Sequence, residues 1–156
     1  MKRRRFLSGS PNHVYQRSLN GSVIFYSLED CLVYFTVFCT SAVKYGVSVL
    51  GLCVMYDHIH QLLEAPDLRT LSTFERMVNL KFSYEYFEDL RQKGHDSQLD
   101  GQQCAARCAT PIPNSGHLFR SSFGSAPKVG GKAVRTCIAY LYSNPVERHI
   151  HEEAIK

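Results

Sequence analysis

Residues 47–63 constrain the fold of this 156-residue chain more than any other segment. The run Val47 to Tyr56 is rich in Val and Leu, and His58 to Leu63 is a second apolar run. Both have the length and composition of β-strands, and Met55-Tyr56-Asp57 between them predicts a turn. Gly51 indicates a bulge or bend in the first strand. We therefore expect two neighbouring strands, the first of them central in its sheet.

Helical periodicity precedes this β-rich segment. Ser27 is a candidate N-cap, with acidic residues in the turn that follows, and Gly46 is a candidate C-terminal stop. The pattern predicts a helix from Ser27 through about Tyr45. The apolar stripe expected to face the core consists of Leu28, Leu32, Phe35, Cys39, Ala42 and Val43.

Two more helices are predicted downstream. One covers about 72–91, capped by Thr70 or Ser72, and its apolar stripe is Phe74, Met77, Val78, Phe82, Tyr86 and Leu90. The other runs from Lys132 to about Ser143 and is limited by Pro145, because the residue before proline avoids helical geometry. Its stripe is Val134, Cys137, Ile138 and Leu141.

The remaining segments complete the expected architecture. His13 to Ser18 predicts a first strand, and Val23 to Tyr26 extends a hairpin or leads into the first helix. Residues 93–115 predict a flexible loop, and Gly124 to Gly131 predicts another. The segment Gly116 to Phe123, which separates these loops, is expected to be ordered, with Phe119 and Phe123 as its anchors. The order of elements indicates one α+β domain over residues 1–156, a two-layer sandwich in which helices pack on a central antiparallel sheet.

Composition narrows the class of protein. The chain is 44% hydrophobic and 21% charged, which is ordinary for a globular domain. No apolar run reaches the roughly 18 residues that span a bilayer, so no membrane partner is expected. The basic start, Met1 to Arg5, is followed by polar residues, which argues against a secretion signal. We expect a cytoplasmic protein with reduced cysteines, and its net charge of +4 is compatible with a nucleic-acid partner.

The pair His58 and His60 is the first candidate for chemistry. Alternate side chains of a strand share a face, so both imidazoles would point the same way, and such a pair can chelate a divalent cation. The alternative is two histidines on a partly exposed strand. A histidine-triad hydrolase would need a histidine where Leu62 stands, and the zinc-protease pattern His-Glu-x-x-His is absent.

Tyr140 and Asn144 form the second candidate, because residues four apart lie one turn apart on a helix. The alternative is a buried tyrosine and a helix-terminal asparagine, and spacing alone leaves both open. A third candidate, a zinc knuckle of Cys104 and Cys108 with His95 or His117, rests only on a possible ligand spacing. The alternative, which the spacing favours, is a flexible loop with incidental cysteines.

Four ordered blocks of the chain resemble the REP-associated tyrosine transposases, within the HUH single-tyrosine superfamily. The blocks are Asn12-His13-Val14 through Arg17; Cys53 to Glu64; Ser115 to Arg120 with Phe123; and Tyr140-Leu141-Tyr142-Ser143-Asn144-Pro145-Val146. The resemblance extends from about His13 to Arg148. One departure is Tyr56-Asp57, where the family has Pro-Asn.

The resemblance implies a ferredoxin-like fold and a DNA transposase that cleaves and rejoins single-stranded or hairpin DNA. It implies Mg²⁺ or Mn²⁺ held by His58, His60 and Asn144, and Tyr140 as the nucleophile that forms a 5′-phosphotyrosine, with Tyr142 ranked second. Candidate DNA-binding residues are Arg120, Lys128, Lys132 and Phe119, followed by Arg3 to Arg5 and Lys81.

Other functions remain open from the sequence. The leading alternative is a catalytically inactive protein of the same fold that binds single-stranded or hairpin DNA. A nuclease that activates water, and a purely structural protein, are further alternatives. Monomer and homodimer are both compatible with the sequence.

Overall fold

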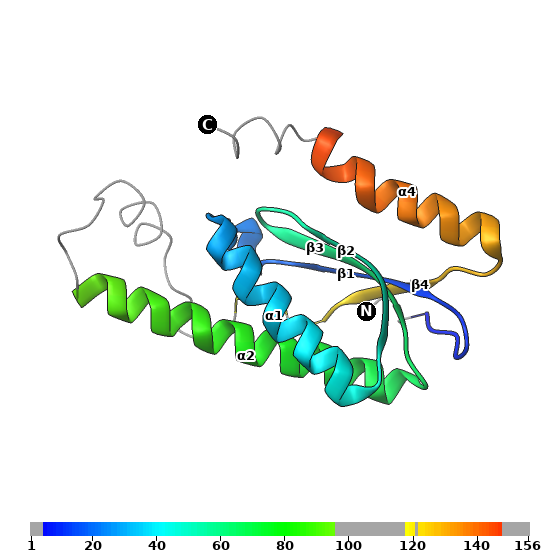
Figure 1. Ribbon diagram of the computed structural model, residues 1–156, viewed down its shortest axis with the longest axis horizontal. Helices are drawn as coiled ribbons and strands as arrows, with labels where there is room; N and C mark the ends of the chain where they lie inside the picture. The colour runs from blue at the N-terminus through cyan, green and yellow to red at the C-terminus, as the bar shows by residue number, and fades with distance from the viewer. Residues whose placement is uncertain (1–4, 96–117, 121, 148–156) are drawn as a thin grey trace.

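The computed structural model describes residues 5–95, 118–120 and 122–147 (Figure 1). Within them, the elements in chain order are β1 (Asn12–Arg17), the short 3-10 helix η1 (Leu19–Gly21), α1 (Leu28–Tyr45), β2 (Ser48–Val54), β3 (His58–Glu64), α2 (Leu68–His95), β4 (Gly124–Pro127) and α4 (Gly131–Glu147). Residues 93–95 belong to α2, so the predicted helix end near residue 91 and the predicted loop start at 93 were wrong. The rest of the predicted loop, residues 96–115, lies outside the described residues. So do Arg3, Arg4 and three of the four zinc-knuckle candidates, Cys104, Cys108 and His117.

The four strands form one antiparallel sheet in the order β2-β3-β1-β4. With the intervening helices α1 and α2, this is the ferredoxin-like βαββαβ arrangement. The predicted turn at residues 55–57 is confirmed, and the strand register shifts between Val49 and Gly51, as expected for a bulge. Two predictions were wrong: β2 lies at an edge of the sheet rather than in its centre, and Gly124–Pro127 is a strand rather than a loop.

Helices cover both faces of the sheet. In Figure 1, α1 and α2 lie below the strands and α4 lies above them. Successive side chains of β3 point to opposite faces of the sheet. Leu63 packs in the hydrophobic cluster on the face of α1 and α2, and Leu62 packs with Cys137 and Leu141 of α4 on the other face. The expected α+β sandwich is confirmed, and α4 adds a third layer to it.

Helix α1 has the predicted ends but not the predicted buried face. The Ser27 hydroxyl accepts a hydrogen bond from the Asp30 backbone N–H at 3.2 Å, and Gly46 ends the helix with a φ of 63°. The buried aromatic residues are Tyr34 and Phe38. The predicted stripe is largely wrong: Leu28, Leu32, Phe35 and Val43 are exposed, and of that stripe only Ala42 is buried.

Helix α2 begins earlier than predicted. The Asp67 carboxylate accepts a hydrogen bond from the Thr70 backbone N–H at 2.7 Å, so Asp67 caps the helix instead of Thr70 or Ser72. Most of the predicted apolar stripe is confirmed, because Phe74, Val78, Phe82 and Tyr86 are buried. The same face carries the buried carboxylate of Glu75, which accepts a hydrogen bond from Gln61 at 3.5 Å.

Helix α4 continues past Pro145 to Glu147, so the predicted end at Ser143 was wrong. Its predicted apolar stripe is confirmed, with Cys137 and Leu141 buried against the sheet. Gly51 of β2 permits the close approach, because a Cβ atom there would lie 2.8 Å from Cδ1 of Leu141. Over the described part of the chain, no helix is both long and apolar enough to cross a membrane.

Candidate active site

His58 and His60 lie on the face of β3 that α4 covers. Ile59 between them packs in the cluster on the opposite face, as strand alternation requires. The two imidazole centroids are 5.1 Å apart and the rings are nearly perpendicular, at 88°. His58 is only 5% exposed, so its orientation is set by packing as well as by hydrogen bonds.

The Nδ1 atom of each imidazole has a protein partner. Nδ1 of His58 lies 2.5 Å from Oδ1 of Asp57, and the Asp57 carboxylate accepts a hydrogen bond from the Nδ1–H group. Nδ1 of His60 lies 3.1 Å from Nε2 of His13 on β1. When both Nδ1 atoms carry the proton, each Nε2 keeps its lone pair and can bind a ligand.

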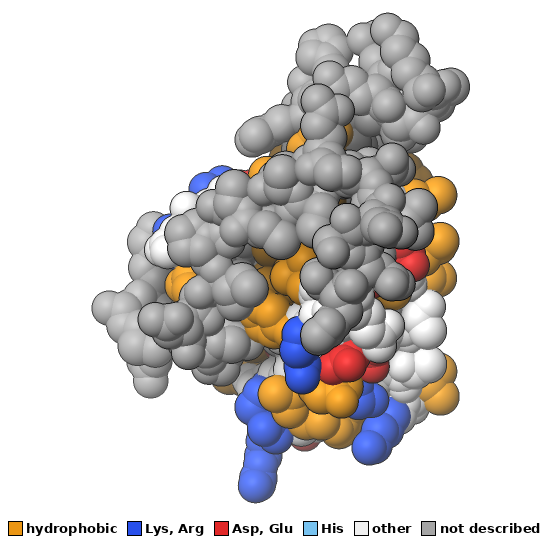
Figure 2. Space-filling model, turned by 90° about the vertical axis from the view of Figure 1, so that its left-hand side faces the viewer, with side chains coloured by type: hydrophobic (Ala, Val, Ile, Leu, Met, Phe, Trp, Pro, Cys, Tyr) orange, Lys and Arg blue, Asp and Glu red, His pale blue; other side chains and the backbone are white. Residues whose placement is uncertain are grey.

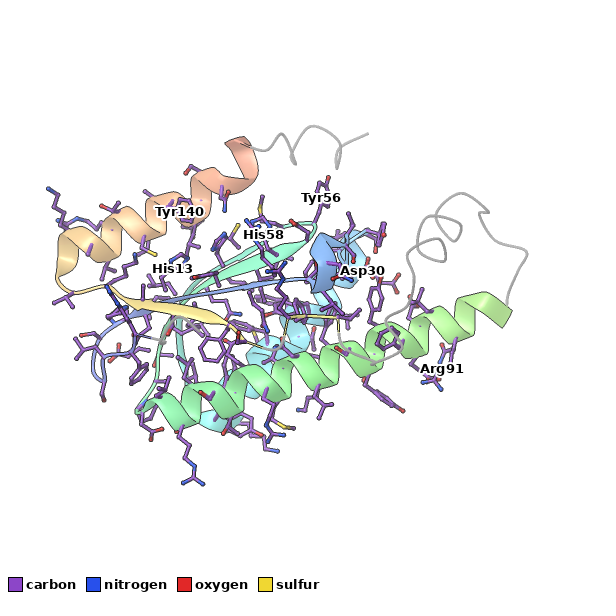
Figure 3. The ribbon with its side chains drawn as sticks, turned by 180° about the vertical axis from the view of Figure 1, so that it is seen from behind. His13, Asp30, Tyr56, His58, Arg91 and Tyr140 are labelled. Carbon is purple, nitrogen blue, oxygen red and sulfur yellow. The ribbon has the colours of Figure 1, made fainter. Side chains whose placement is uncertain are left out.

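Tyr140 reaches this pair from α4. Its hydroxyl lies 3.4 Å from Nε2 of His60, and its ring centroid is 5.3 Å from the imidazole. The Asn144 amide donates to the Tyr140 hydroxyl at 3.5 Å, as expected for residues one turn apart. Figure 3 shows Tyr140 pointing from α4 toward the sheet near His13 and His58. At 43% exposure Tyr140 can also meet a substrate from solvent.

Tyr142 points elsewhere. It is 77% exposed, whereas Asn144, on the face of the helix that carries Tyr140, is 6% exposed. A helix turns by roughly 100° per residue, which places residues two apart on nearly opposite sides. The structure therefore brings together His58, His60, Tyr140 and Asn144, and leaves Tyr142 outside the group.

The side chains of His58, His60 and Asn144 could supply some, but not all, of the ligands that a hard or borderline divalent cation needs. His58 and His60 offer Nε2 and Asn144 offers an amide oxygen, while water and a substrate oxygen would complete the coordination. Among the described residues there is no group of three or more His, Cys, Asp or Glu side chains arranged to hold a metal ion. Binding to two imidazoles and one amide would accordingly be weak and would depend on the substrate.

The candidate DNA-binding residues are scattered. Lys128 carries a positive charge near His13, and together with burial, the larger cause, it lowers the pKa of His13 below its usual value. The backbone of Arg120 bonds to Arg17 at the end of β1, and Lys132 lies exposed at the start of α4. Phe119 is 5% exposed and belongs to the core, so its ring is not available for stacking on a base.

Basic side chains also occur away from Tyr140. Lys81 lies on α2, which is below the strands in Figure 1, whereas α4 is above them. Figure 2 shows Lys and Arg side chains around hydrophobic ones at the lower end of one face, the level of α1 and α2 in Figure 1. The positive net charge therefore does not by itself define a DNA groove.

Two residues of the site, His13 and Asp57, were not predicted from the sequence to be site residues. His13 was assigned only to a strand, and Asp57 only to a turn. Asp57 directly precedes His58, which was a usable local signal. His13 becomes a neighbour of His60 only through the pairing of β1 with β3, where Tyr15 is opposite His60. The two histidines that this pairing brings together are 47 residues apart in the sequence.

Two solved structures share this fold. One is a REP-associated tyrosine transposase bound to a REP hairpin, with a TM-score of 0.62 and 14% identity, covering 95% of this chain and 73% of that one. The other is described as "a putative transposase" from Deinococcus radiodurans R1, with a TM-score of 0.54 and 17% identity, covering 92% and 97% of the two chains. The comparison confirms the fold that the sequence resemblance implies.

No protein-family model matches the chain, and no curated protein matches it. The chain is thus similar to transposases in fold.

Proposed function

We propose that this chain is a metal-dependent tyrosine transposase that cleaves and rejoins single-stranded DNA with Tyr140 as its nucleophile. The observation that carries the proposal is the contact between the Tyr140 hydroxyl and the imidazole of His60, which are 80 residues apart in the sequence. His58 and Asn144 lie beside this contact. A tyrosine hydroxyl can act as a covalent nucleophile when neighbouring groups or a metal ion activate it, and the two imidazoles and the amide are such neighbouring groups here.

In the proposed step, the Tyr140 oxygen forms a bond to the phosphorus of a DNA phosphodiester. The bond from phosphorus to the 3′ oxygen of the preceding nucleotide breaks, and that oxygen takes up a proton and leaves as a 3′-hydroxyl. The phenolic proton passes to solvent, which reaches the partly exposed side chain. The product is a 5′-phosphotyrosine, which a 3′-hydroxyl reverses without ATP because the covalent link conserves the bond energy.

The residues around Tyr140 position it for attack. Asn144 donates to its oxygen, and Nε2 of His60 lies 3.4 Å from that oxygen. Mg²⁺ or Mn²⁺ held by His58, His60 and Asn144 would neutralise the non-bridging phosphate oxygens and orient the phosphate. The partners Asp57 and His13 contact the Nδ1 atoms of the two imidazoles, so the Nε2 atoms would be the ones that bind such an ion.

The proposed substrate is single-stranded or hairpin DNA. Support comes from the fold shared with a transposase that is bound to a REP hairpin, and from the net charge of +4. The alternative is a protein of this fold that binds such DNA without cleaving it.

A labelled hairpin with single-stranded flanks, incubated with the protein and Mn²⁺, separates these functions. We expect a 3′-end label to run with the protein in denaturing gels and a 5′-end label to be released on a shorter strand that ends in a 3′-hydroxyl. Cleavage without any protein-linked label would identify a nuclease that uses water. Binding without cleavage would identify the inactive DNA-binding protein, and no binding would refute both DNA functions.

A further inference from the structure

Tyr15 is an exposed aromatic residue beside the candidate active site with no role in the proposed step. It lies on β1 opposite His60 of β3 and Gly124 of β4. Its ring centroid is 6.0 Å from that of His13 and 6.4 Å from that of His60. With 46% of its surface exposed, it presents an aromatic surface next to the group that would bind the scissile phosphate.

The neighbouring strand is shaped to receive this ring. A Cβ atom added to Gly124 would lie 2.1 Å from Cζ of Tyr15 and 2.4 Å from its hydroxyl oxygen. The ring therefore lies directly over the Gly124 backbone, where every other residue type would displace it. Gly124 does not have a positive φ, so its lack of a side chain matters here for space rather than for backbone geometry.

The surroundings of Tyr15 suit a nucleotide strand. Arg17, the next residue on the same face of β1, is exposed and lies opposite His58. An aromatic ring and a cation along one strand match the two requirements of single-stranded DNA binding, which are base stacking and backbone neutralisation.

We propose that Tyr15, held over Gly124, is a stacking site for one unpaired base next to the scissile phosphate. This inference rests on the proposed function, because it takes single-stranded DNA as the ligand. The competing explanation is structural: an aromatic ring over a glycine stabilises a strand pair on its own.

The test combines protein variants with single abasic positions in the DNA. Full-length Tyr140→Phe protein is titrated with a fluorescent single strand and with strands that lack one base at each position in turn. We expect one position whose abasic form binds about 5- to 150-fold more weakly, the range that base–aromatic stacking gives. Tyr15→Leu, which still covers Gly124 but lacks an aromatic ring, should lower affinity for the intact strand and abolish the sensitivity at that position.

Two further variants sharpen the result. Gly124→Ala should act like Tyr15→Leu, because it moves the ring at little cost: the atoms it meets are the far end of a side chain. Tyr84→Ala, at a tyrosine that is 62% exposed on α2, should bind like its parent. Thermal unfolding of each variant separates a loss of affinity from a loss of folding.

Three outcomes would overturn the inference. If Tyr15→Leu binds the intact strand as tightly as its parent, the stacking site is refuted while the proposed function stands. If Tyr15→Leu weakens intact and abasic strands equally, its effect is structural. If the parent binds no single-stranded DNA, the inference and the proposed function both fall.

Discussion

Replacing Asp57 tests how the candidate metal site is organised. The carboxylate lies 2.5 Å from Nδ1 of His58, and the Asp57 side chain is 34% exposed against 6% for His58. Loss of a group that hydrogen-bonds to a metal-binding histidine typically weakens metal affinity about 10- to 100-fold. That range corresponds to roughly 1.4–2.7 kcal/mol. Because solvent screens the partly exposed carboxylate, we expect Asp57→Ala to fall near the lower end of the range.

Asp57→Asn separates the hydrogen bond from the charge. An amide oxygen can still accept a hydrogen bond from His58 Nδ1–H, so this variant should lose less affinity than Asp57→Ala. Mn²⁺ binding is measured by the loss of the free-ion electron paramagnetic resonance signal, and nitrogen chemical shifts of His58 report its tautomer independently of metal. Asp67→Ala, at the exposed cap of α2, is the control and should bind Mn²⁺ like the unmodified protein.

The reasoning would be refuted by equal Mn²⁺ affinities for Asp57→Ala and the unmodified protein, or by an unchanged tautomer of His58. Absence of saturable Mn²⁺ binding by the unmodified protein, with single-stranded DNA present, would refute the metal site itself.

Three further predictions concern packing, thiol chemistry and DNA affinity. Gly51→Val should lower the yield of the covalent DNA adduct and the melting temperature, because the added carbons meet Leu141 where α4 approaches the sheet; an unchanged adduct yield would show that α4 tolerates displacement. Burial raises the pKa of the Cys53 thiol from 9.0 to about 11, so iodoacetamide should label this thiol slowly at pH 8 unless the protein is unfolded. The stability that the protonated Cys53 thiol contributes should be lost as the pH rises from about 9 to 11. Affinity for single-stranded DNA should fall as the salt concentration rises, with a slope of log affinity against log salt of about −0.7 for each phosphate contacted. Fluorescence anisotropy at several salt concentrations measures this slope, and a slope of zero would exclude a phosphate-binding site.

Local signals predicted the parts of the fold that depend on local chemistry. The capping residue Ser27 and the terminal Gly46 marked the ends of α1, because these residue types satisfy backbone groups at helix ends. The alternation of β3 placed His58 and His60 on one face, and the four-residue spacing placed Tyr140 and Asn144 on one side of α4. Those two inferences supplied both halves of the candidate site.

Non-local features could not be predicted in the same way. Periodicity shows that α1 has apolar residues at helical spacing, but both of its sides carry them, and the large aromatic rings of Tyr34 and Phe38 took the buried side. The strand β4 is short and contains glycine and proline, so only its pairing with β1 identifies it. His13 became part of the site through the register of β1 and β3, which a single sequence does not specify.

The identity of the nucleophile is the central claim, and formation of a covalent adduct by matched tyrosine variants tests it most directly. Each variant is incubated with 3′-labelled hairpin DNA and Mn²⁺ and is then denatured. Tyr140→Phe removes only a hydroxyl, so fold and DNA binding should persist while the adduct disappears. Tyr142→Phe, whose side chain is 77% exposed and points away, should retain most of the adduct. An adduct that survives Tyr140→Phe and is lost in Tyr142→Phe would contradict the assignment of Tyr140 as the nucleophile. An adduct that survives both substitutions would refute the mechanism in which one of these two tyrosines attacks the DNA.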